Sequence, residues 1–392
     1  MDLIFCTEAR FIRRSATDVY SVDGGINDEI LKRYLLCFER VYVMARVCYN
    51  IDEVVNQHYR ITDSRISFID LPYYIGPTQY LKVRQRVQAV MRANVCRGLA
   101  YICRIPGQIA GLMTYFLRKE GIPFGVEVVG DPWDVFAQGG VHHPLRIFFR
   151  YKGYWSLKKI VQSASTVLYV TEHQLQSRYP ASLNAYQVSV SDVQIQINDL
   201  PAKCGPFVKK QSYTLLSVGS LEQMYKAPDI VLDACLMLKN KGINFRLVWL
   251  GEGKYKNELI KLAEKLSIAD LCTFVGNVTR QEVYRYLNES DIFLMVSRTE
   301  GLPRALVEAM AMGLPCIGSN VGGIPELLDK EMIVPKEDAE ALANKIEYLL
   351  THIDVANQQA ERNYKEAQKY YEPVLQKKRV AFFEHLISIS QK

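Results

Sequence analysis

The chain has 392 residues, a net charge of +6 and a hydrophobic fraction of 49%, which indicates a globular protein of about two domains and argues against a disordered or fibrous one. Its nine cysteines are scattered, without a CxxC pair or a nearby histidine at ligand spacing, and this argues against a disulfide framework or a zinc site. The first residues, MDLIFCTEARFIRR, place an apolar run before the basic residues. That order is the reverse of a signal peptide, so we expect a cytoplasmic protein.

In the first half of the chain, short β-branched or aromatic runs predict strands at 2–6, 41–47, 66–72, 99–105, 124–131 and 166–171. Longer amphipathic stretches separate these runs and predict helices. The pattern weakens between residues 185 and 197. The segment PAKCGPF at 201–207 contains two prolines and a glycine and predicts a linker.

Two segments of the first half are basic and contain no acid. Eight basic residues lie between Lys82 and Lys119, and five lie between Arg146 and Lys159, where aromatic residues are interleaved with them. This composition suits a segment at an anionic membrane surface, and a solvated helix face fits it equally well. A nucleic-acid groove can look similar, but no motif for binding RNA or DNA accompanies it, so we expect no nucleic acid as partner.

The second half restarts the alternation, with strands predicted at 213–220, 246–253, 272–277, 292–298 and 315–320. Strands that alternate with helices predict an α/β fold of two Rossmann-like domains with parallel sheets, facing a cleft between the domains. We expect the first domain at 1–198 and the second at 199–372. The remaining residues, 373–392, predict a helix that could pack back across both domains.

The strands of the second half end in small residues. Gly219 and Ser220 follow the first of them, and Gly251, Gly276 and Gly301 follow later ones. Glycine lets a backbone approach a ligand closely. Four such turns in a row predict a cleft lined by the strand ends.

The segment 297–313 combines two acids with a helix start. Pro303 suits the first turn of a helix over 304–313 that Gly313 ends, and the free amides at its start, with Arg304, predict an anion site. Glu300 precedes this helix and Glu308 lies inside it. Carboxylates beside an anion site suit the hydroxyls of a ribose or a sugar, so the segment predicts a nucleotide-sugar pocket. Taken alone, Glu300 could be an acid that interacts with the helix dipole, and Glu308 could be a solvated helix residue.

The run EGLPRALVEAMAMGLPCIGSNVGGIPE resembles the E-x7-E signature of retaining glycosyltransferase family 4, which has the GT-B fold and serves in surface polysaccharide biosynthesis. The run LLSVGSLEQMYKAPDIVLDA resembles the donor-phosphate loop of that family. The resemblance extends from about Tyr213 to Glu326. In the first half it is looser, and is carried by YSVDGGIN, which resembles a glycine-rich acceptor loop after the first strand, and by VEVVGDPWD.

The resemblance implies a role for each matching position. Glu308 would bind the ribose, Glu300 the hydroxyls of the donor sugar, and Lys226 the diphosphate. The loop and helix start that follow Glu300 would meet the phosphate and the sugar, and the first-domain loop would approach donor or acceptor. These further positions are Gly301, Leu302, Pro303 and Arg304, and in the first domain Gly24 and Gly25. The family implies no metal and no cofactor, and a UDP or GDP sugar as donor.

Two departures from the family pattern concern the chemistry. Many relatives have an arginine where Ser220 stands, and many have a histidine after a central strand of the first domain, where this chain reads VVGDPWD. Asp131 or Asp134 could serve the acceptor instead. The alternative is that Asp131 simply forms a turn with Pro132. His142 and His143 precede a proline, and a structural turn suits them better than a place in the cleft.

We therefore expect a retaining glycosyltransferase that moves a sugar from a nucleoside diphosphate to a glycan or lipid-linked acceptor, in polysaccharide biosynthesis at the inner face of the membrane. Two alternatives stay open. The first is a GT-B-like sugar-nucleotide epimerase or a phosphorylase. The second is a non-catalytic subunit that binds nucleotide sugars, which Ser220 and the missing histidine favour.

Overall fold

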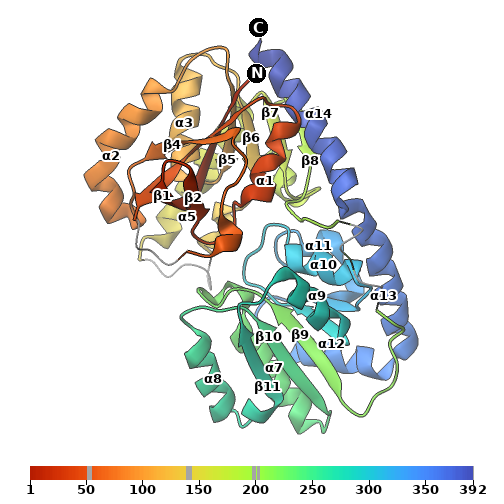
Figure 1. The fold of residues 1–392 in the computed structure, drawn as a ribbon. Helices are drawn as coiled ribbons and strands as arrows, with labels where there is room; N and C mark the ends of the chain where they lie inside the picture. Colours follow the sequence, from red (N-terminus) through yellow and green to blue (C-terminus); the bar gives the residue numbers. More distant parts are fainter. Residues whose placement is uncertain (51–54, 138–143, 197–199, 201–203, 392) are drawn as a thin grey trace.

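The computed structural model describes residues 1–50, 55–137, 144–196, 200 and 204–391, and it folds them around two separate sheets (Figure 1). The predicted boundary between residues 198 and 199 lies outside the described residues, as do His142 and His143. The described part of the predicted linker, from Cys204 onward, contains no helix or strand before Tyr213.

The first sheet has the order β4-β3-β1-β5-β6-β7-β8, with every neighbouring pair parallel. A further strand, β2, pairs antiparallel with the end of β1. The strands are β1 Leu3–Ser15, β2 Asp18–Ser21, β3 Val41–Tyr49, β4 Ile66–Leu71, β5 Ala100–Ile105, β6 Gly125–Val128, β7 Thr166–Tyr169 and β8 Tyr186–Ser189.

Helices cover both faces of this sheet because successive residues of a strand point to opposite sides. Ile4 and Cys6 of β1 face one hydrophobic core, which α2, α3 and α5 complete. Leu3 and Phe5 face the other core, with α1 and α14. The helices of this half are α1 Asp28–Lys32, α2 Gly76–Ala93, α3 Gln108–Lys119, α4 Pro132–Val135, α5 Arg146–Ser163 and α6 Gln174–Arg178.

The second sheet is also parallel, with the order β11-β10-β9-β12-β13-β14. Its strands are β9 Tyr213–Val218, β10 Phe245–Leu250, β11 Cys272–Gly276, β12 Ile292–Met295, β13 Cys316–Ser319 and β14 Ile333–Val334. Its helices are α7 Pro228–Asn240, α8 Lys256–Lys265, α9 Arg280–Asn288, α10 Arg304–Ala311, α11 Ile324–Leu327, α12 Ala339–Thr351 and α13 Ile353–Ala367.

The last helix, α14 (Glu372–Ser390), runs along the first domain, whereas α13 packs on the second (Figure 1). Leu375, Phe382, Phe383 and Leu386 of α14 are buried, and α14 contacts β5, β7 and β8. The end of the chain therefore ties the two halves together.

The predicted fold class is confirmed, and every predicted strand overlaps an observed one. Three strands were not predicted: β2, β8 and β14. β2 (DVYS) and β8 (YQVS) mix polar with apolar residues, and β14 has only two residues, so none of them forms an apolar run in the sequence. β8 lies in the segment where the pattern weakens. The loop with Gly24 and Gly25 was predicted after the first strand, but it follows β2, since β1 and β2 form a hairpin.

Candidate active site

The predicted donor residues gather where the strands of the second sheet end. Because the strands are parallel, their carboxyl ends meet at one edge. The amide of Gly219 donates to the carbonyl of Leu250 at 2.9 Å, and the amide of Gly251 donates to that of Gly276 at 2.8 Å. Three of the predicted glycines are thus joined through the backbone in one row.

The structure gives Gly251 a reason other than ligand approach. Its φ is +142°, and a Cβ built there would lie 2.1 Å from the carbonyl oxygen of Gly219. No side chain fits at that distance, so the glycine is needed for packing one strand-end loop on the next. Ser220 is exposed. Its hydroxyl links the same two strand-end loops, because it donates to the carbonyl of Glu252 at 3.4 Å and accepts from the amide of Glu222 at 3.2 Å.

Lys226 and Glu300 form an ion pair at this edge. Lys226 ends the short 3-10 helix η4 (Met224–Lys226), and Glu300 lies in the loop after β12. The hydroxyl of Ser297 also donates to the Glu300 carboxylate, at 2.9 Å. The aliphatic stem of Lys226 lies across Gly219, since a Cβ there would come within 2.6 Å of it. The structure therefore brings together Gly219 and Lys226 from one sequence motif and Glu300 from another.

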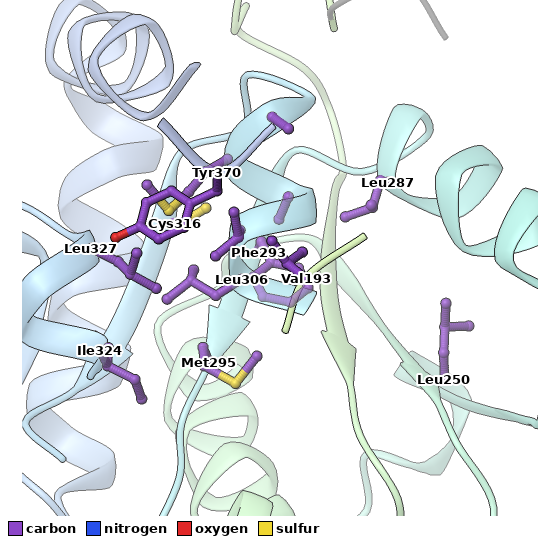
Figure 2. Packing of buried hydrophobic residues seen from close by; sticks show 14 of the residues in the cluster. Val193, Leu250, Leu287, Phe293, Met295, Leu306, Cys316, Ile324, Leu327 and Tyr370 are labelled. Carbon is purple, nitrogen blue, oxygen red and sulfur yellow. The ribbon is translucent and has the colours of Figure 1, made fainter. Parts of the chain in front are cut away.

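The core behind this loop is apolar. Figure 2 shows Phe293 and Met295 of β12 beside Leu306 of α10, and all three are buried. β12 and α10 flank the loop that carries Glu300, so this packing fixes both of its ends. A rigid support of this kind keeps a ligand-binding loop in place.

Arg298 was not predicted, and it holds the site together. Its guanidinium donates to both carboxylate oxygens of Asp229, to both of Glu337 at 2.7 and 2.9 Å, and to the carbonyl of Met224 at 2.9 Å. Its backbone amide donates to the carbonyl of Tyr225 at 2.6 Å. Burial disfavours its charge, but the bonds to Asp229 and Glu337 outweigh burial and raise its pKa. Arg298 therefore fixes the turn that carries Lys226 against the loop that carries Glu300.

Glu308 has different neighbours from Glu300. It is half-buried on α10, and no hydrogen bond to its carboxylate is present among the described residues. Burial raises its pKa, and the nearby charges of Arg304 and Arg280 oppose that shift. A half-buried carboxylate with open acceptor sites suits hydroxyl donors such as those of a ribose. Arg304 is exposed and begins α10 as predicted, whereas Pro303 is the N-cap and not a residue of the first turn.

One acid of the first domain, Glu29, lies within electrostatic range of this edge. The electrostatic surroundings of Arg280, on α9, include Glu308 of the second domain and Glu29 of the first. Glu29 lies on α1, close in sequence to Gly24 and Gly25. Gly24 has φ +69°, and a Cβ there would come within 2.6 Å of the Tyr59 ring. The glycine-rich loop is therefore shaped by Tyr59, and it directly precedes α1.

Asp131 has a structural role in the first domain. It is 3% exposed and caps α4, accepting from the amide of Trp133 at 2.8 Å. The hydroxyl of Tyr179 donates to it at 2.6 Å, and Arg178 pairs with it. Burial raises its pKa, and the neighbouring charge of Asp134 adds to the shift. These partners favour the turn over the catalytic role that we considered for this residue.

The loop after β12 also contacts the first domain. A Cβ at Gly301 would lie 2.9 Å from the carbonyl oxygen of Val129, at the end of β6. The amide of Gly323 donates to the carbonyl of Gly301 at 2.7 Å, and a Cβ at Gly323 would come within 2.7 Å of Leu302. Gly301 and Leu302 thus lie at the junction of the two domains.

Glu326 is a second residue that was not predicted. Its carboxylate accepts from the amides of Glu172, His173 and Gln174, at 2.6, 3.1 and 2.6 Å. These amides begin α6 of the first domain, so the acid caps a helix of the other domain. The only earlier signal was its place at the end of the motif VGGIPE.

A cavity of about 720 Å³ lies between the domains beside this contact. A Cβ at Gly322 would come within 2.2 Å of the carbonyl oxygen of Glu300, so the cavity adjoins the predicted donor loop. Its charged lining consists of Asp134, Arg150, Arg178, Arg298, Glu326 and Lys336. The predicted cleft between the domains therefore has a counterpart in the structure.

The comparisons with known proteins agree with this architecture. Residues 205–366 match the family described as glycosyl transferases group 1. Protein CapJ of Staphylococcus aureus is 24% identical over 86% of this chain and 83% of its own length. The amylovoran biosynthesis glycosyltransferase AmsK of Erwinia amylovora is 37% identical, over 34% of this chain and 35% of its own.

The fold has counterparts among solved structures as well. Anabaena Alr3699/HepE, solved in complex with UDP-glucose, has a TM-score of 0.66 at 14% identity, over 97% of this chain and 98% of that one. The resemblance to glycosyltransferases and the GT-B fold are thereby confirmed.

Proposed function

We propose that this chain, whose second domain matches the group 1 glycosyltransferases, is a retaining enzyme that moves a sugar from a nucleoside diphosphate to an acceptor hydroxyl. One observation carries the proposal. Lys226, Glu300 and Ser297 form a hydrogen-bonded cluster beside Gly219, where a parallel sheet of this kind binds its ligands. HepE was solved with UDP-glucose bound, which supports a sugar nucleotide, with UDP or GDP, as donor.

In this proposal, donor binding exchanges the partners of Lys226. Its ammonium is now paired with Glu300. A diphosphate would take over the ammonium and leave the Glu300 carboxylate to accept from sugar hydroxyls. Glu308 would accept from the ribose, while Arg304 and the backbone amides at Gly301 and Leu302 would meet the phosphate and the sugar.

The transfer step breaks the bond between the sugar and the diphosphate oxygen and forms a bond to the acceptor oxygen on the same face of the ring. Lys226, Arg304 and the start of α10 would neutralise the negative charge that develops on the leaving diphosphate. The departing phosphate oxygen would take the proton of the acceptor hydroxyl. The scheme therefore needs no side chain of the protein as a base. This fits Asp131, whose carboxylate is already bound by Trp133, Tyr179 and Arg178. The scheme also assigns no role to a metal or cofactor.

The acceptor is the less defined substrate. AmsK is named as an amylovoran biosynthesis glycosyltransferase, and this supports a glycan or a lipid-linked glycan used in surface polysaccharide assembly. We place the reaction at the cytoplasmic face of the membrane. No helix in the described ranges is long and apolar enough to cross a membrane.

The test is turnover of a panel of UDP, GDP and ADP sugars, with and without lipid-linked and soluble glycans. We expect one sugar nucleotide to release its nucleoside diphosphate faster when acceptor is present, with the anomeric configuration retained in the product. Tight binding of a sugar nucleotide without turnover in any mixture would instead favour a binding subunit. A product with inverted configuration would contradict the retaining mechanism.

A further inference from the structure

One face of the first domain consists of α2, α3 and α5, which pack side by side on the same side of the sheet. These helices, of 18, 12 and 18 residues, contain no Asp or Glu. The whole chain carries only +6, so its positive charge is concentrated here. The basic residues of these helices are Lys82, Arg84, Arg86, Arg92, Arg118, Lys119, Arg146, Arg150, Lys152, Lys158 and Lys159.

The solvent side of α5 is also apolar. Phe148, Tyr151 and Trp155 are 58%, 53% and 61% exposed, at spacings of three and four residues that align them along one side of a helix. Ile147 beside them is 62% exposed. Side chains of this size are normally buried, so the row requires an explanation.

Packing in the hydrophobic core does not explain the exposed row of apolar side chains on α5. The opposite side of α5 is buried, through Leu157, Ile160 and Val161. The helix is thus apolar on two sides, with one side packed on the sheet and the other facing outward. Leu81 of α2 and Tyr115 of α3 are exposed on the same layer, at 67% and 53%.

We propose that the α2–α3–α5 layer docks on an anionic lipid surface, with Phe148, Tyr151 and Trp155 entering the interfacial region. Aromatic side chains favour that region, and lysines and arginines beside them are attracted to anionic headgroups. The ammonium of Lys158 lies 5.5 Å from the centre of the Trp155 ring, and that of Lys152 lies 5.8 Å from the centre of the Phe148 ring. Charge and apolar surface therefore coincide on one helix.

A second copy of the chain fits this surface poorly. In a two-fold dimer the same patch would face itself, and two layers without a single acid would then repel each other. Nucleic acid would use the charge but would leave the aliphatic side chains Ile147 and Leu81 without a role. A lipid surface uses both features.

The position of α5 also suits a membrane-bound acceptor, a point that rests on the proposed function. Arg150 of α5 lines the cavity between the domains, and its guanidinium donates to the carbonyl of Trp133 at 2.8 Å. The start of the docking helix therefore adjoins the cavity beside Glu300. A bilayer on this layer would present lipid-linked acceptors next to the transfer site.

Vesicle sedimentation of the full chain at low salt tests the docking without donor or acceptor, so its result does not depend on the transfer activity. Vesicles of phosphatidylcholine with 30% phosphatidylglycerol, a composition that we choose for its negative charge, are compared with pure phosphatidylcholine. We expect clear binding to the anionic vesicles, weakened by salt. The variant Lys152→Glu, Lys158→Glu, Lys159→Glu should lose about tenfold or more of that binding.

The matched control reverses three exposed lysines of the second domain, Lys241, Lys261 and Lys265, and should change binding less than about twofold. Tryptophan fluorescence of the wild type provides a readout that needs no charge variant. It should shift to the blue on anionic vesicles, and Trp155→Phe should abolish the shift. Failure of the wild type to bind, or equal loss in both triple variants, would overturn the proposal. So would binding to duplex DNA without binding to vesicles, or a dimer that Phe148→Ala dissociates.

Discussion

Arg298 and Asp229 form a bidentate ion pair, with nitrogen–oxygen distances of 2.8 and 2.7 Å. The pair joins the loop after β12 to the start of α7. Neither residue belongs to the predicted site. Yet the pair fixes both Lys226 and Glu300, because Arg298 also binds the carbonyls of Met224 and Tyr225. The geometry of the proposed donor site thus depends on a residue that would not touch the donor.

Replacing Arg298 tests this positioning role. Arg298→Ala leaves the carboxylates of Asp229 and Glu337 without their partner, and we expect a loss of about 1–3 kcal/mol in the free energy of unfolding, since both acids are partly solvated. Arg298→Lys keeps the positive charge but cannot form the bidentate pair. It should therefore retain more stability and activity than Arg298→Ala. Urea denaturation and kcat measured on the folded fraction check this. The exposed Arg65→Ala is the control. Unchanged kcat in folded Arg298→Ala would contradict the positioning role.

Lys226→Ala should slow transfer much more than it weakens donor binding. If the ammonium neutralises the leaving diphosphate, its loss costs about 100-fold or more in kcat. Steady-state kinetics with the donor found in the panel provide the measurement. Lys241→Ala removes an exposed lysine that pairs with Glu347 and should leave kcat unchanged. Equal kinetics for Lys226→Ala and the wild type would remove Lys226 from the mechanism.

Glu308→Gln should weaken nucleotide binding and stabilise the fold. The folded pKa of Glu308 is raised by burial, so the folded state binds its proton more tightly than the unfolded chain does. Stability then falls as the pH rises from the unfolded value through the folded one, and the ionised acid costs stability at neutral pH. Glutamine removes that cost.

We expect a higher Tm for Glu308→Gln than for the wild type at pH 7, and a difference that shrinks toward pH 4. The nucleoside diphosphate should bind about tenfold more weakly, as for the loss of one charge-assisted hydrogen bond. Thermal shift with and without UDP or GDP measures both effects, with Glu264→Gln on exposed α8 as control. A lower Tm at neutral pH together with unchanged nucleotide affinity would refute the assignment.

Asp131→Asn should act on stability and not on chemistry. The substitution breaks the charge pair with Arg178, which is itself 28% exposed, so we expect a cost of about 2 kcal/mol, less than for a fully buried pair. Asp134→Asn shares the Arg178 partner but is more exposed, and should cost less. Denaturation curves and kcat of the folded fraction distinguish the roles. A fall of 100-fold or more in kcat at unchanged stability would restore the catalytic interpretation.

Glu326→Ala should loosen the junction between the domains. It removes three bonds from a carboxylate to the amides of residues 172–174, and we expect a larger radius of gyration by small-angle scattering and a higher KM for the acceptor. Glu331→Ala, an exposed acid nearby in sequence, should change neither quantity. An unaltered scattering curve for Glu326→Ala would show that other contacts hold the domains.

Much of the fold follows from local sequence patterns. Apolar runs rich in β-branched or aromatic residues predicted most strands of both sheets, because alternation and helical periodicity are properties of neighbouring residues. No such run marks β2 or β8, which mix polar with apolar residues, or β14, which has only two residues. The sequence also predicted the candidate donor positions Gly219, Lys226 and Glu300, because strand ends in a parallel sheet share one edge.

The sequence by itself determined the class of fold and the strand ends on which the proposed chemistry depends. Only the tertiary structure decided the partners of Arg298 and Glu326, which lie 69 residues away at Asp229 and 154 residues away at Glu172. It also decided that Asp131 is enclosed, and that the aromatic row on α5 faces outward. Such contacts depend on how elements that are distant in the sequence pack together. Burial and hydrogen bonding between these elements produce no periodic pattern of residues from which they could be predicted.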